Sequence, residues 1–214
     1  AGGPKAFVPV GGRPLIEWSL EAFGRAQRVG PVIVALPPGH DLELGGQVSI
    51  VPGGEHRSQS VAAALREVRT ELVAVHDAAR PLVTAELIDS LVEALASRDD
   101  VAGVIAAARI TDTVKRVTES SAPAGEEGRA APEIEETVSR DRLWAAQTPQ
   151  VFRTEALREA IAAAPGRLAT ATDEALLVEE AGGTILIGES TSENLKVTTP
   201  LDLRVADLLL RERT

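Results

Sequence analysis

The 214-residue sequence contains no cysteine, no methionine and no tyrosine, and only 2% of its residues are aromatic. The lack of cysteine excludes disulfides, thiolate metal sites and a cysteine nucleophile. The three histidines form no obvious Ser-His-Asp pattern. The lack of methionine leaves no initiator residue, and the opening AGGPK is typical of the end of a glycine-rich loop. We therefore expect that further residues precede Ala1.

Positive charge and long apolar runs are also scarce. Lysine and arginine number 22 against 32 aspartates and glutamates, which gives a formal net charge of −10. A field of this sign repels polyphosphate backbones, so nucleic acid is not an expected partner, and an anionic ligand would need local cations and backbone N–H groups. No run approaches the roughly 18 apolar residues of a membrane span, and no signal peptide is visible. We expect a soluble, cytoplasmic protein without a membrane partner.

Strand-like runs alternate with helical periods along the chain. The predicted strands are residues 31–36, 48–51, 72–77 and 101–108, and the last two have the near-continuous apolar character of strands buried on both faces. Apolar residues at helical spacing follow Leu15 and Leu87, and Thr84 and Thr199 are expected N-caps. The alternation predicts an α/β fold with a doubly wound, largely parallel sheet, formed by a single domain over residues 1–214. Ligands bind such sheets beyond the carboxyl ends of the strands.

Residues 119–133 interrupt this alternation. They are small and polar, with proline and glycine, and they separate the strand-like pieces 112–117 and 133–138. We predict a long β-hairpin arm over about residues 112–140 with a mobile tip. Because an isolated hairpin is marginal in water, we expect this arm to pack on a second subunit and to form a homodimer.

Two segments combine strand ends with polar groups. The segment VPGGEHRSQSV (51–61) follows a strand and opens a helix, so its glycines would let the backbone approach a ligand, with Ser58 or Ser60 capping the helix. An ordinary tight turn is the alternative interpretation. In VHDAARP (75–81), Asp77 ends a buried strand and could accept a hydrogen bond from a ribose hydroxyl or approach a phosphate-borne metal, or it could merely cap the next turn.

Other polar residues have a structural interpretation when each is taken alone. Lys5, and Lys196 in a strand-like fragment, can both be solvated surface residues. Thr148 precedes Pro149, which favours an extended conformation and fixes the direction of its hydroxyl. The residues from Thr172 to Glu174 begin a helix, where they would serve as N-cap and as compensation for the helix dipole.

The order and spacing of these motifs resemble one family over the whole chain. The matching stretches are PKAFVPVGGRPLIEWSLEAF, GGEHRSQSV, HDAARP, TDTVKRV, RLWAAQTPQVF, TDEALLVE and NLKVTTPLDL. They are similar to successive motifs of the 2-C-methyl-D-erythritol 4-phosphate cytidylyltransferases. The resemblance implies a Rossmann-like nucleotidyltransferase fold and transfer of CMP from CTP to methylerythritol phosphate, with release of pyrophosphate, in the non-mevalonate pathway to isoprenoid precursors. A ribitol-5-phosphate or other polyol-phosphate cytidylyltransferase, and a non-catalytic nucleotide-binding module, stay open as alternatives.

The resemblance also implies roles for individual residues. By matching motifs, Lys5 and Lys196 would be catalytic and contact the triphosphate and the reacting phosphates. Gly54, Glu55 and Ser60 would read cytosine, Asp77 and Ala78 would contact ribose, and Arg80 would lie on the sugar-phosphate side. Thr113, Arg140 and Thr148 would reach methylerythritol phosphate from the neighbouring subunit, and Thr172 would contact the same substrate. Mg²⁺ would be carried mainly by the triphosphate, with no metal site built by the protein.

The chemistry of the implied reaction agrees with this residue set. The nucleophile is a phosphate monoester with a second pKa of about 6, so it is largely ionised at pH 7 and needs no general base. Two lysines and Mg²⁺ would offset the charge that grows on the leaving pyrophosphate. In one respect the sequence departs from the family. The family's first strand and most of its glycine-rich loop precede the PK motif, where this sequence has only AGG, and a sheet without that strand would expose apolar edges.

Overall fold

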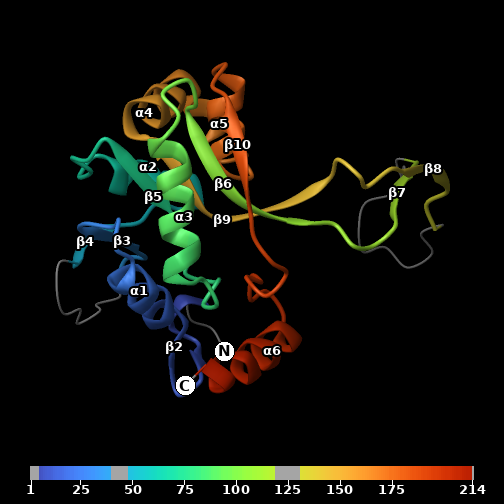
Figure 1. Cartoon of the computed structure of the whole chain (residues 1–214), viewed down its shortest axis with the longest axis horizontal. Helices are drawn as coiled ribbons and strands as arrows, with labels where there is room; N and C mark the ends of the chain where they lie inside the picture. Colours follow the sequence, from blue (N-terminus) through green and yellow to red (C-terminus); the bar gives the residue numbers. More distant parts are fainter. Residues whose placement is uncertain (1–4, 40–47, 119–130, 214) are drawn as a thin grey trace.

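The computed structural model describes residues 5–39, 48–118 and 131–213. Short 3-10 helices lie at Lys5–Phe7 and Pro165–Arg167. The α-helices are α1 (Leu15–Arg25), α2 (Arg57–Leu65), α3 (Ala85–Ala96), α4 (Thr154–Ala163), α5 (Glu174–Glu180) and α6 (Pro200–Arg213). The strands are β1 (Pro9–Val10), β2 (Arg13–Pro14), β3 (Val32–Leu36), β4 (Val48–Pro52), β5 (Leu72–Val75), β6 (Gly103–Arg109), β7 (Val114–Val117), β8 (Ile134–Val138), β9 (Trp144–Arg153) and β10 (Ile185–Glu189) (Figure 1). No helix among these is long and apolar enough to cross a membrane.

A four-stranded sheet with the order β10-β6-β9-β5 forms the centre of the molecule. β10 runs parallel to β6, whereas β9 runs antiparallel to both of its neighbours. β3 and β4 form a separate parallel pair. The predicted α/β class is confirmed, and each of the four predicted strands is present within two residues of its expected ends. The sheet is mixed because of β9, which the sequence did not reveal as a strand.

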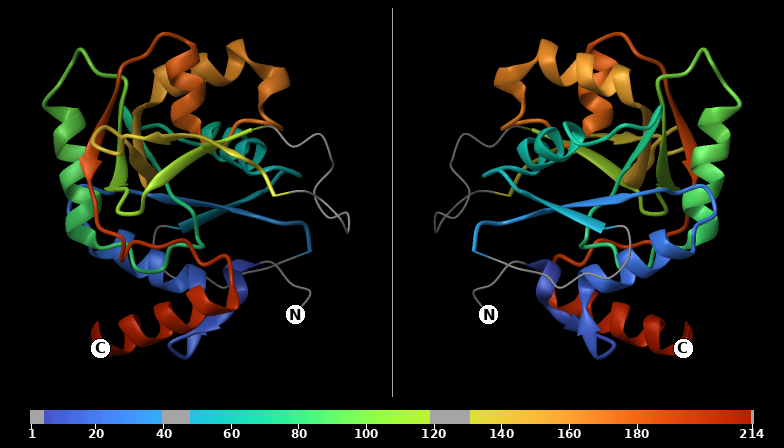
Figure 2. Two further views of the ribbon diagram at one scale, coloured as in Figure 1. Left: turned by 90° about the vertical axis from the view of Figure 1, so that its right-hand side faces the viewer. Right: turned by 90° about the vertical axis from the view of Figure 1, so that its left-hand side faces the viewer.

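Helices cover both faces of this sheet because neighbouring residues of its buried strands point to opposite sides. Val104 of β6 and Val151 of β9 pack against Leu91 of α3. The next residues along the two strands, Ile105 and Phe152, pack in the cluster formed with α4 and α5. Figure 2 shows α3 on one side of the sheet and α4 and α5 on the other. Burial on both faces is the reason that β6 is apolar without alternation.

The helix starts agree with two of the predicted caps. The Thr84 side chain accepts a hydrogen bond from the N–H of Leu87, and that of Thr199 accepts from the N–H of Asp202. The prediction of Ser58 or Ser60 as the cap of α2 is wrong. His56 occupies the N-cap, and its N–H donates to the Gln59 side chain at 3.1 Å. The hydroxyl of Ser60 is thereby left for the turn that precedes the helix.

An arm made of β7 and β8 stands away from the body (Figure 1). The two strands are antiparallel, with Val114 opposite Val138 and Val117 opposite Ile134. Arg116 and Glu136 form an ion pair across the arm, and the side chains of Val117 and Ile134 remain exposed. The predicted tip falls mostly outside the described residues, because residues 119–130 are not among them. Packing of this arm on a second subunit stays a prediction.

Candidate active site

Asp77, which follows β5, is the centre of a charged cluster. Its Oδ1 accepts from Nε of Arg57 at 2.6 Å, and its Oδ2 lies 2.9 Å from Nζ of Lys196. Burial acts to raise the pKa of the Asp77 carboxyl, but the charges and hydrogen bonds of Arg57 and Lys196 outweigh it and hold this pKa at about 2. Asp77 is therefore an anion at neutral pH and can only accept hydrogen bonds.

Arg57 extends this cluster to a second carboxylate. The guanidinium donates through Nη1 to Oε2 of Glu174 at 2.5 Å, and the Glu174 side chain is fully buried. Burial acts to lower the pKa of Arg57, but Glu174 and Asp77 raise it above its ordinary value. The guanidinium is thus a permanent cation between two carboxylates, one at the start of α5 and one at the end of β5.

His76 and Thr148 hold the backbone at Asp77. The N–H of Asp77 donates to Oγ1 of Thr148 at 3.0 Å, and Oγ1 lies 3.0 Å from Nδ1 of His76. Nε2 of His76 lies 3.2 Å from the carbonyl oxygen of Arg80. Because a carbonyl only accepts, we assign the ring hydrogen to Nε2, so that the Thr148 hydroxyl donates to Nδ1. Burial, as the largest cause, lowers the pKa of His76 to about 4, so the ring is neutral at pH 7.

The turn before α2 is closed by the hydroxyl of Ser60, which accepts from the N–H of Gly54 at 3.0 Å. The turn also joins β3, since the N–H of Gly53 donates to the carbonyl of Leu36 at 2.7 Å. A Cβ atom on Gly54 would lie only 2.4 Å from Cβ of Gln59, so this turn has no room for a side chain there. Approach of a ligand to the backbone of Gly54 stays a prediction.

The loop that carries Lys196 is held in place by hydrogen bonds to Arg80 and to β9. Arg80 is 9% exposed, and its Nη1 donates to the carbonyl of Asn194 at 2.7 Å. The Asn194 side chain donates in turn to Oε1 of Gln147 at 3.0 Å and to the carbonyl of Thr148 at 2.9 Å. These bonds tie the loop to β9 two residues before Lys196. The loop is irregular, so the strand-like fragment predicted around Lys196 is wrong.

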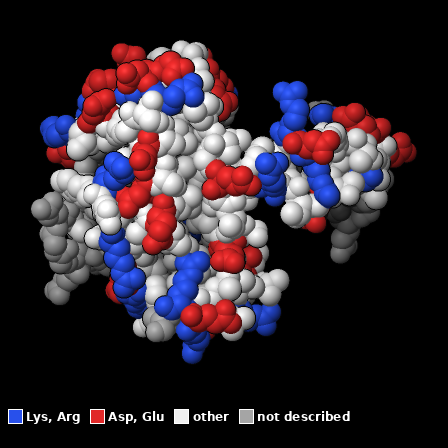
Figure 3. Space-filling view, in the orientation of Figure 1, with Lys and Arg blue, Asp and Glu red and all other residues white. Residues whose placement is uncertain are grey.

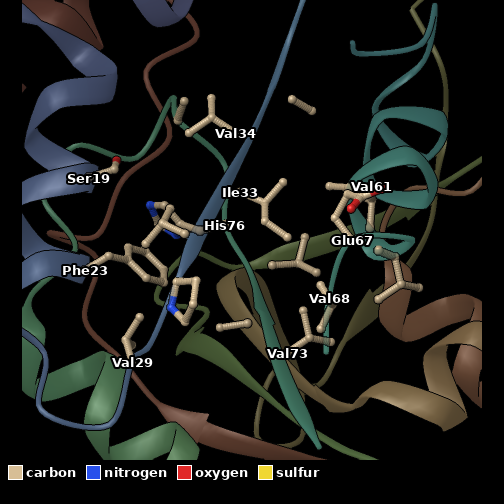
Figure 4. A pocket seen from close by; sticks show the side chains of 18 of the residues that line it. Ser19, Phe23, Val29, Ile33, Val34, Val61, Glu67, Val68, Val73 and His76 are labelled. Carbon is tan, nitrogen blue, oxygen red and sulfur yellow. The ribbon is translucent and has the colours of Figure 1, made fainter. Parts of the chain in front are cut away.

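A cavity of about 690 Å³ lies between β3 and β5 and reaches this cluster. Figure 4 shows His76 and Phe23 on one side of it, Val61 and Val68 of the α2 region on the other, and Ile33 between them. Most of its lining is aliphatic, and Arg57, Ser60, His76 and Asp77 are among its polar residues. Aliphatic walls offer an anion no hydrogen-bond donors, so an anionic ligand would depend on the polar residues of the lining.

The structure brings five predicted site residues into one neighbourhood, namely Gly54, Ser60, Asp77, Thr148 and Lys196. The side chain of Lys5 is exposed, and its neighbours Ala6 and Phe7 pack near Leu36 and Ala78. Glu55 and Thr172 are exposed beside α2 and α5 respectively. Thr113 and Arg140 lie at the base of the arm, where Arg140 donates to the carbonyl of Thr111.

Two predicted site residues have structural partners in their own chain. Thr148 is 4% exposed and its hydroxyl bonds to Asp77 and His76, and its reach to the substrate of a neighbouring subunit stays a prediction. Arg80 serves here to hold Asn194, and its contact with substrate stays a prediction.

Sequence reasoning gave no role to Arg57, His76 or Asn194, and gave Glu174 only a role at the start of a helix. Each lies inside a quoted motif, but the signal that distinguishes them is a tertiary contact. The pair of Arg57 and Glu174, for example, joins residues 117 positions apart.

The charged side chains on the surface of the molecule are unevenly distributed. Figure 3 shows acidic side chains over the end of the body that carries α4 and α5, and side chains of both signs on the arm. The chain as a whole carries a formal net charge of −10. An anion at the polar end of the cavity would therefore depend on the nearby cations rather than on the field of the whole protein.

Comparison with known proteins shows the family to which this chain belongs. Residues 1–212 match the family model of 2-C-methyl-D-erythritol 4-phosphate cytidylyltransferase. The chain belongs to this family. The cytidylyltransferase of Aromatoleum aromaticum is 40% identical, over 98% of this chain and 88% of its own. The one from Bacillus licheniformis is 36% identical, over 98% and 89%. The crystal structure of the cytidylyltransferase from Thermus thermophilus superimposes with a TM-score of 0.80 at 38% identity, covering 99% of this chain and 95% of that one.

Membership in the cytidylyltransferase family agrees with where the polar groups lie. Asp77 and the turn at Gly54 both follow strands, β5 and β4, at their carboxyl ends. That edge is where α/β sheets bind nucleotides. β5 belongs to the four-stranded sheet and β4 to the separate β3–β4 pair, so the two carboxyl ends come from different sheets.

The lowered pKa of His76 predicts a pH dependence of stability. Between pH 6.5 and 4 the unfolded chain binds a proton that folded His76 does not, so the free energy of unfolding should fall as the pH drops through this window, by at most about 3 kcal/mol. Urea unfolding of wild type and His76→Gln from pH 7.5 to 4 measures this, and the variant should show the shallower decline. Equal slopes for wild type and His76→Gln would contradict the assignment.

Proposed function

We propose that this chain transfers CMP from CTP to 2-C-methyl-D-erythritol 4-phosphate and releases pyrophosphate, as a step toward isoprenoid precursors in the non-mevalonate pathway. The observation that carries the proposal is the ion pair of Asp77 with Lys196, which Arg57 joins to the helix that follows the Gly54 turn, in a chain whose residues 1–212 match the family. A cytoplasmic location, inferred from the sequence, stays a prediction.

In this proposal the body of the molecule holds the nucleotide. The backbone at Gly54 and the hydroxyl of Ser60 meet the polar edge of cytosine, with Glu55 beside them, and Asp77 accepts from a ribose hydroxyl, with Ala78 beside it. Since Asp77 is anionic and its main chain is held by Thr148, it offers a fixed acceptor. An acceptor that is oriented before binding costs little reorganisation when the substrate arrives.

The lysines act on the phosphates. An oxygen of the acceptor phosphate attacks the α-phosphorus of CTP, a P–O bond forms, and the bond to pyrophosphate breaks. Lys5 and Lys196 stabilise the negative charge that grows on the phosphate oxygens. Neutral His76 is engaged at both ring nitrogens, so it serves to position groups rather than to transfer protons. The acceptor phosphate is already ionised at pH 7, which removes the need for a base.

Magnesium fits this site as a companion of the triphosphate. Among the described residues no three His, Asp or Glu side chains gather closely enough to hold a metal, and both oxygens of Asp77 already face cations. Mg²⁺ is commonly bound through substrate phosphates, so in this proposal the triphosphate would carry most of the coordination of the ion. The bound ion would supply further neutralisation of phosphate charge.

A substrate panel tests the proposed function. With CTP and Mg²⁺, the protein should release pyrophosphate with methylerythritol phosphate and far more slowly with ribitol 5-phosphate. A preference for ribitol 5-phosphate would move the chain to the related polyol-phosphate enzymes. Nucleotide binding without pyrophosphate release from any acceptor would instead support a non-catalytic module.

Removing either lysine should affect turnover more than binding. Lys196→Ala and Lys5→Ala are each expected to lower kcat roughly 100-fold or more, with a smaller change in KM for CTP, since the cations face charge that grows in the transition state. Lys196→Arg should recover activity only in part, because a planar fork replaces a compact charge. Arg98→Ala, after α3 at the opposite edge of the sheet, is a matched control that should leave kcat unchanged. A raised KM with unchanged kcat would contradict the assignment.

We also propose that the arm joins two chains into a homodimer with shared sites. Support comes from the exposed Val117 and Ile134, 43% and 62% accessible, on a hairpin that stands away from the body. Thr113 and Arg140, at the base of this arm, would contact methylerythritol phosphate in the partner's site, and Thr172 would contact it from the body. CTP would then be bound by one chain and its acceptor by both.

Subunit exchange tests the shared site. Arg140→Ala and Lys5→Ala should each be nearly inactive as homodimers. A heterodimer of the two would contain one site with both lesions and one with neither. Random equal mixing makes roughly half of the dimers heterodimers, so activity should recover to about a quarter of wild type. If exchange is confirmed by native mass spectrometry and activity does not return, Arg140 and Lys5 serve the same chain's site.

A further inference from the structure

Glu174 is a buried carboxylate that the proposed reaction does not use. Its side chain is 0% exposed at the start of α5, and within the described part of the chain Oε1 has no hydrogen-bond partner. Burial, the largest cause, raises the pKa of this carboxyl, and the charge of Arg57 opposes that shift. A buried carboxylate with one unbonded oxygen is costly, and its interaction with Arg57 is what offsets the cost.

The cap of α5 does not explain this carboxylate. Asp173 occupies the N-cap and accepts from the N–H of Leu176 at 3.0 Å. Glu180, at the other end of the same helix, pairs with Arg167, but both of these side chains are more than 40% exposed. Exposed pairs of that kind contribute little to stability. Glu174 differs because it is enclosed and is directed at one guanidinium.

That guanidinium connects Glu174 to Asp77. Nη1 of Arg57 binds Glu174 at 2.5 Å, and Nε binds Oδ1 of Asp77 at 2.6 Å. The guanidinium is planar and rigid, so fixing its Nη1 fixes the direction in which Nε points. Arg57 is 30% exposed and begins α2, so without Glu174 its long side chain would keep Asp77 as its one ion-pair partner within residues 5–39, 48–118 and 131–213.

Asp77 needs this support most during the reaction. In the ligand-free arrangement its Oδ2 lies beside Lys196. Lys196 is 44% exposed on a flexible stem and, in the proposed function, turns toward the phosphates. Once it does so, Arg57 is the charged partner that continues to orient the Asp77 carboxylate.

We propose that Glu174 is a positioning residue that acts through Arg57 to aim the Asp77 carboxylate at a ribose hydroxyl of CTP, and so sets the preference for ribonucleotides over deoxyribonucleotides. The inference rests on the proposed function, in which Asp77 contacts ribose.

The test compares three nucleotides in two matched variants. Glu174→Gln keeps the size of the side chain and an oxygen that can accept from Arg57, but removes the charge. Glu180→Gln makes the same chemical change in the same helix. With methylerythritol phosphate as acceptor, kcat/KM is measured for CTP, 2′-deoxy-CTP and 3′-deoxy-CTP. Glu174→Gln should lower the ratio of kcat/KM for CTP to kcat/KM for one of the deoxy analogues by roughly tenfold. A change of this size is typical of the coupling between directly interacting groups. Glu180→Gln should leave both ratios unchanged.

A purely structural role gives a different result. It would lower the melting temperature and the active fraction, and would reduce kcat/KM equally for all three nucleotides. Equal reduction for Glu174→Gln would therefore overturn the proposal. If this variant does not fold, Arg57→Lys carries the test, since a point charge cannot bind both carboxylates in fixed directions, and it should lower the same ratio.

Asp77→Ala separates this inference from the proposed function. If Asp77→Ala lowers the ratio and neither Glu174→Gln nor Arg57→Lys does, the positioning role is refuted while the cytidylyltransferase assignment stands. If Asp77→Ala leaves the ratio unchanged, Asp77 does not read ribose and the inference falls with that contact. If wild type turns over none of the three nucleotides, the proposed function itself is refuted.

Discussion

The pairing of the Asp77 carboxylate is the constraint on which the geometry of this sheet edge depends. A partly buried anion must be matched by cations, and here Arg57 and Lys196 take one oxygen each. Arg57 belongs to α2 and also binds Glu174 of α5, while Lys196 belongs to the loop before α6. One carboxylate thereby joins four segments that are far apart in the sequence. The positions of the groups that would bind CTP follow from this pairing and from the bonds of Thr148 and Asn194.

Most of the helices and strands could be predicted because their sequences carry a local signal. β6 is apolar on both faces and α3 repeats leucine at helical spacing after a threonine cap, so pattern and structure agree. β9 could not be predicted in this way. Its inner half contains Gln147, Thr148, Pro149 and Gln150, which lack both alternation and continuous apolarity. They are nevertheless buried, since Gln147 and Gln150 bond to Thr191 and Asp173 respectively. The burial of these polar residues in β9 therefore depends on tertiary hydrogen bonds, which cannot be recognised in the local sequence.

The same distinction applies to the site. Asp77, Ser60 and Lys196 could be predicted as site residues because they stand in motifs whose order and spacing match those of the family. Arg57, His76 and Glu174 occur in the same motifs, but their importance lies in which partner each one meets. His76 is neutral because it is enclosed and bonded at both nitrogens, and Glu174 depends on one guanidinium from another helix. Burial and partner choice are properties of the fold, so they become visible only when the segments are assembled.

The electrostatic result of this assembly is that two central groups, Asp77 and His76, keep a constant charge near neutral pH. The pKa of Asp77 is held at about 2 and that of His76 at about 4, so the first stays an anion and the second stays neutral when the pH varies between about 6 and 8. Chemistry that needed a protein proton shuttle would be poorly served by such groups, because a useful acid or base titrates near the working pH. Phosphoryl transfer with an acceptor that is itself an ionised phosphate has no such need. The acceptor phosphate, with a second pKa of about 6, does titrate in this range, so the substrate supplies the ionisation that Asp77 and His76 do not.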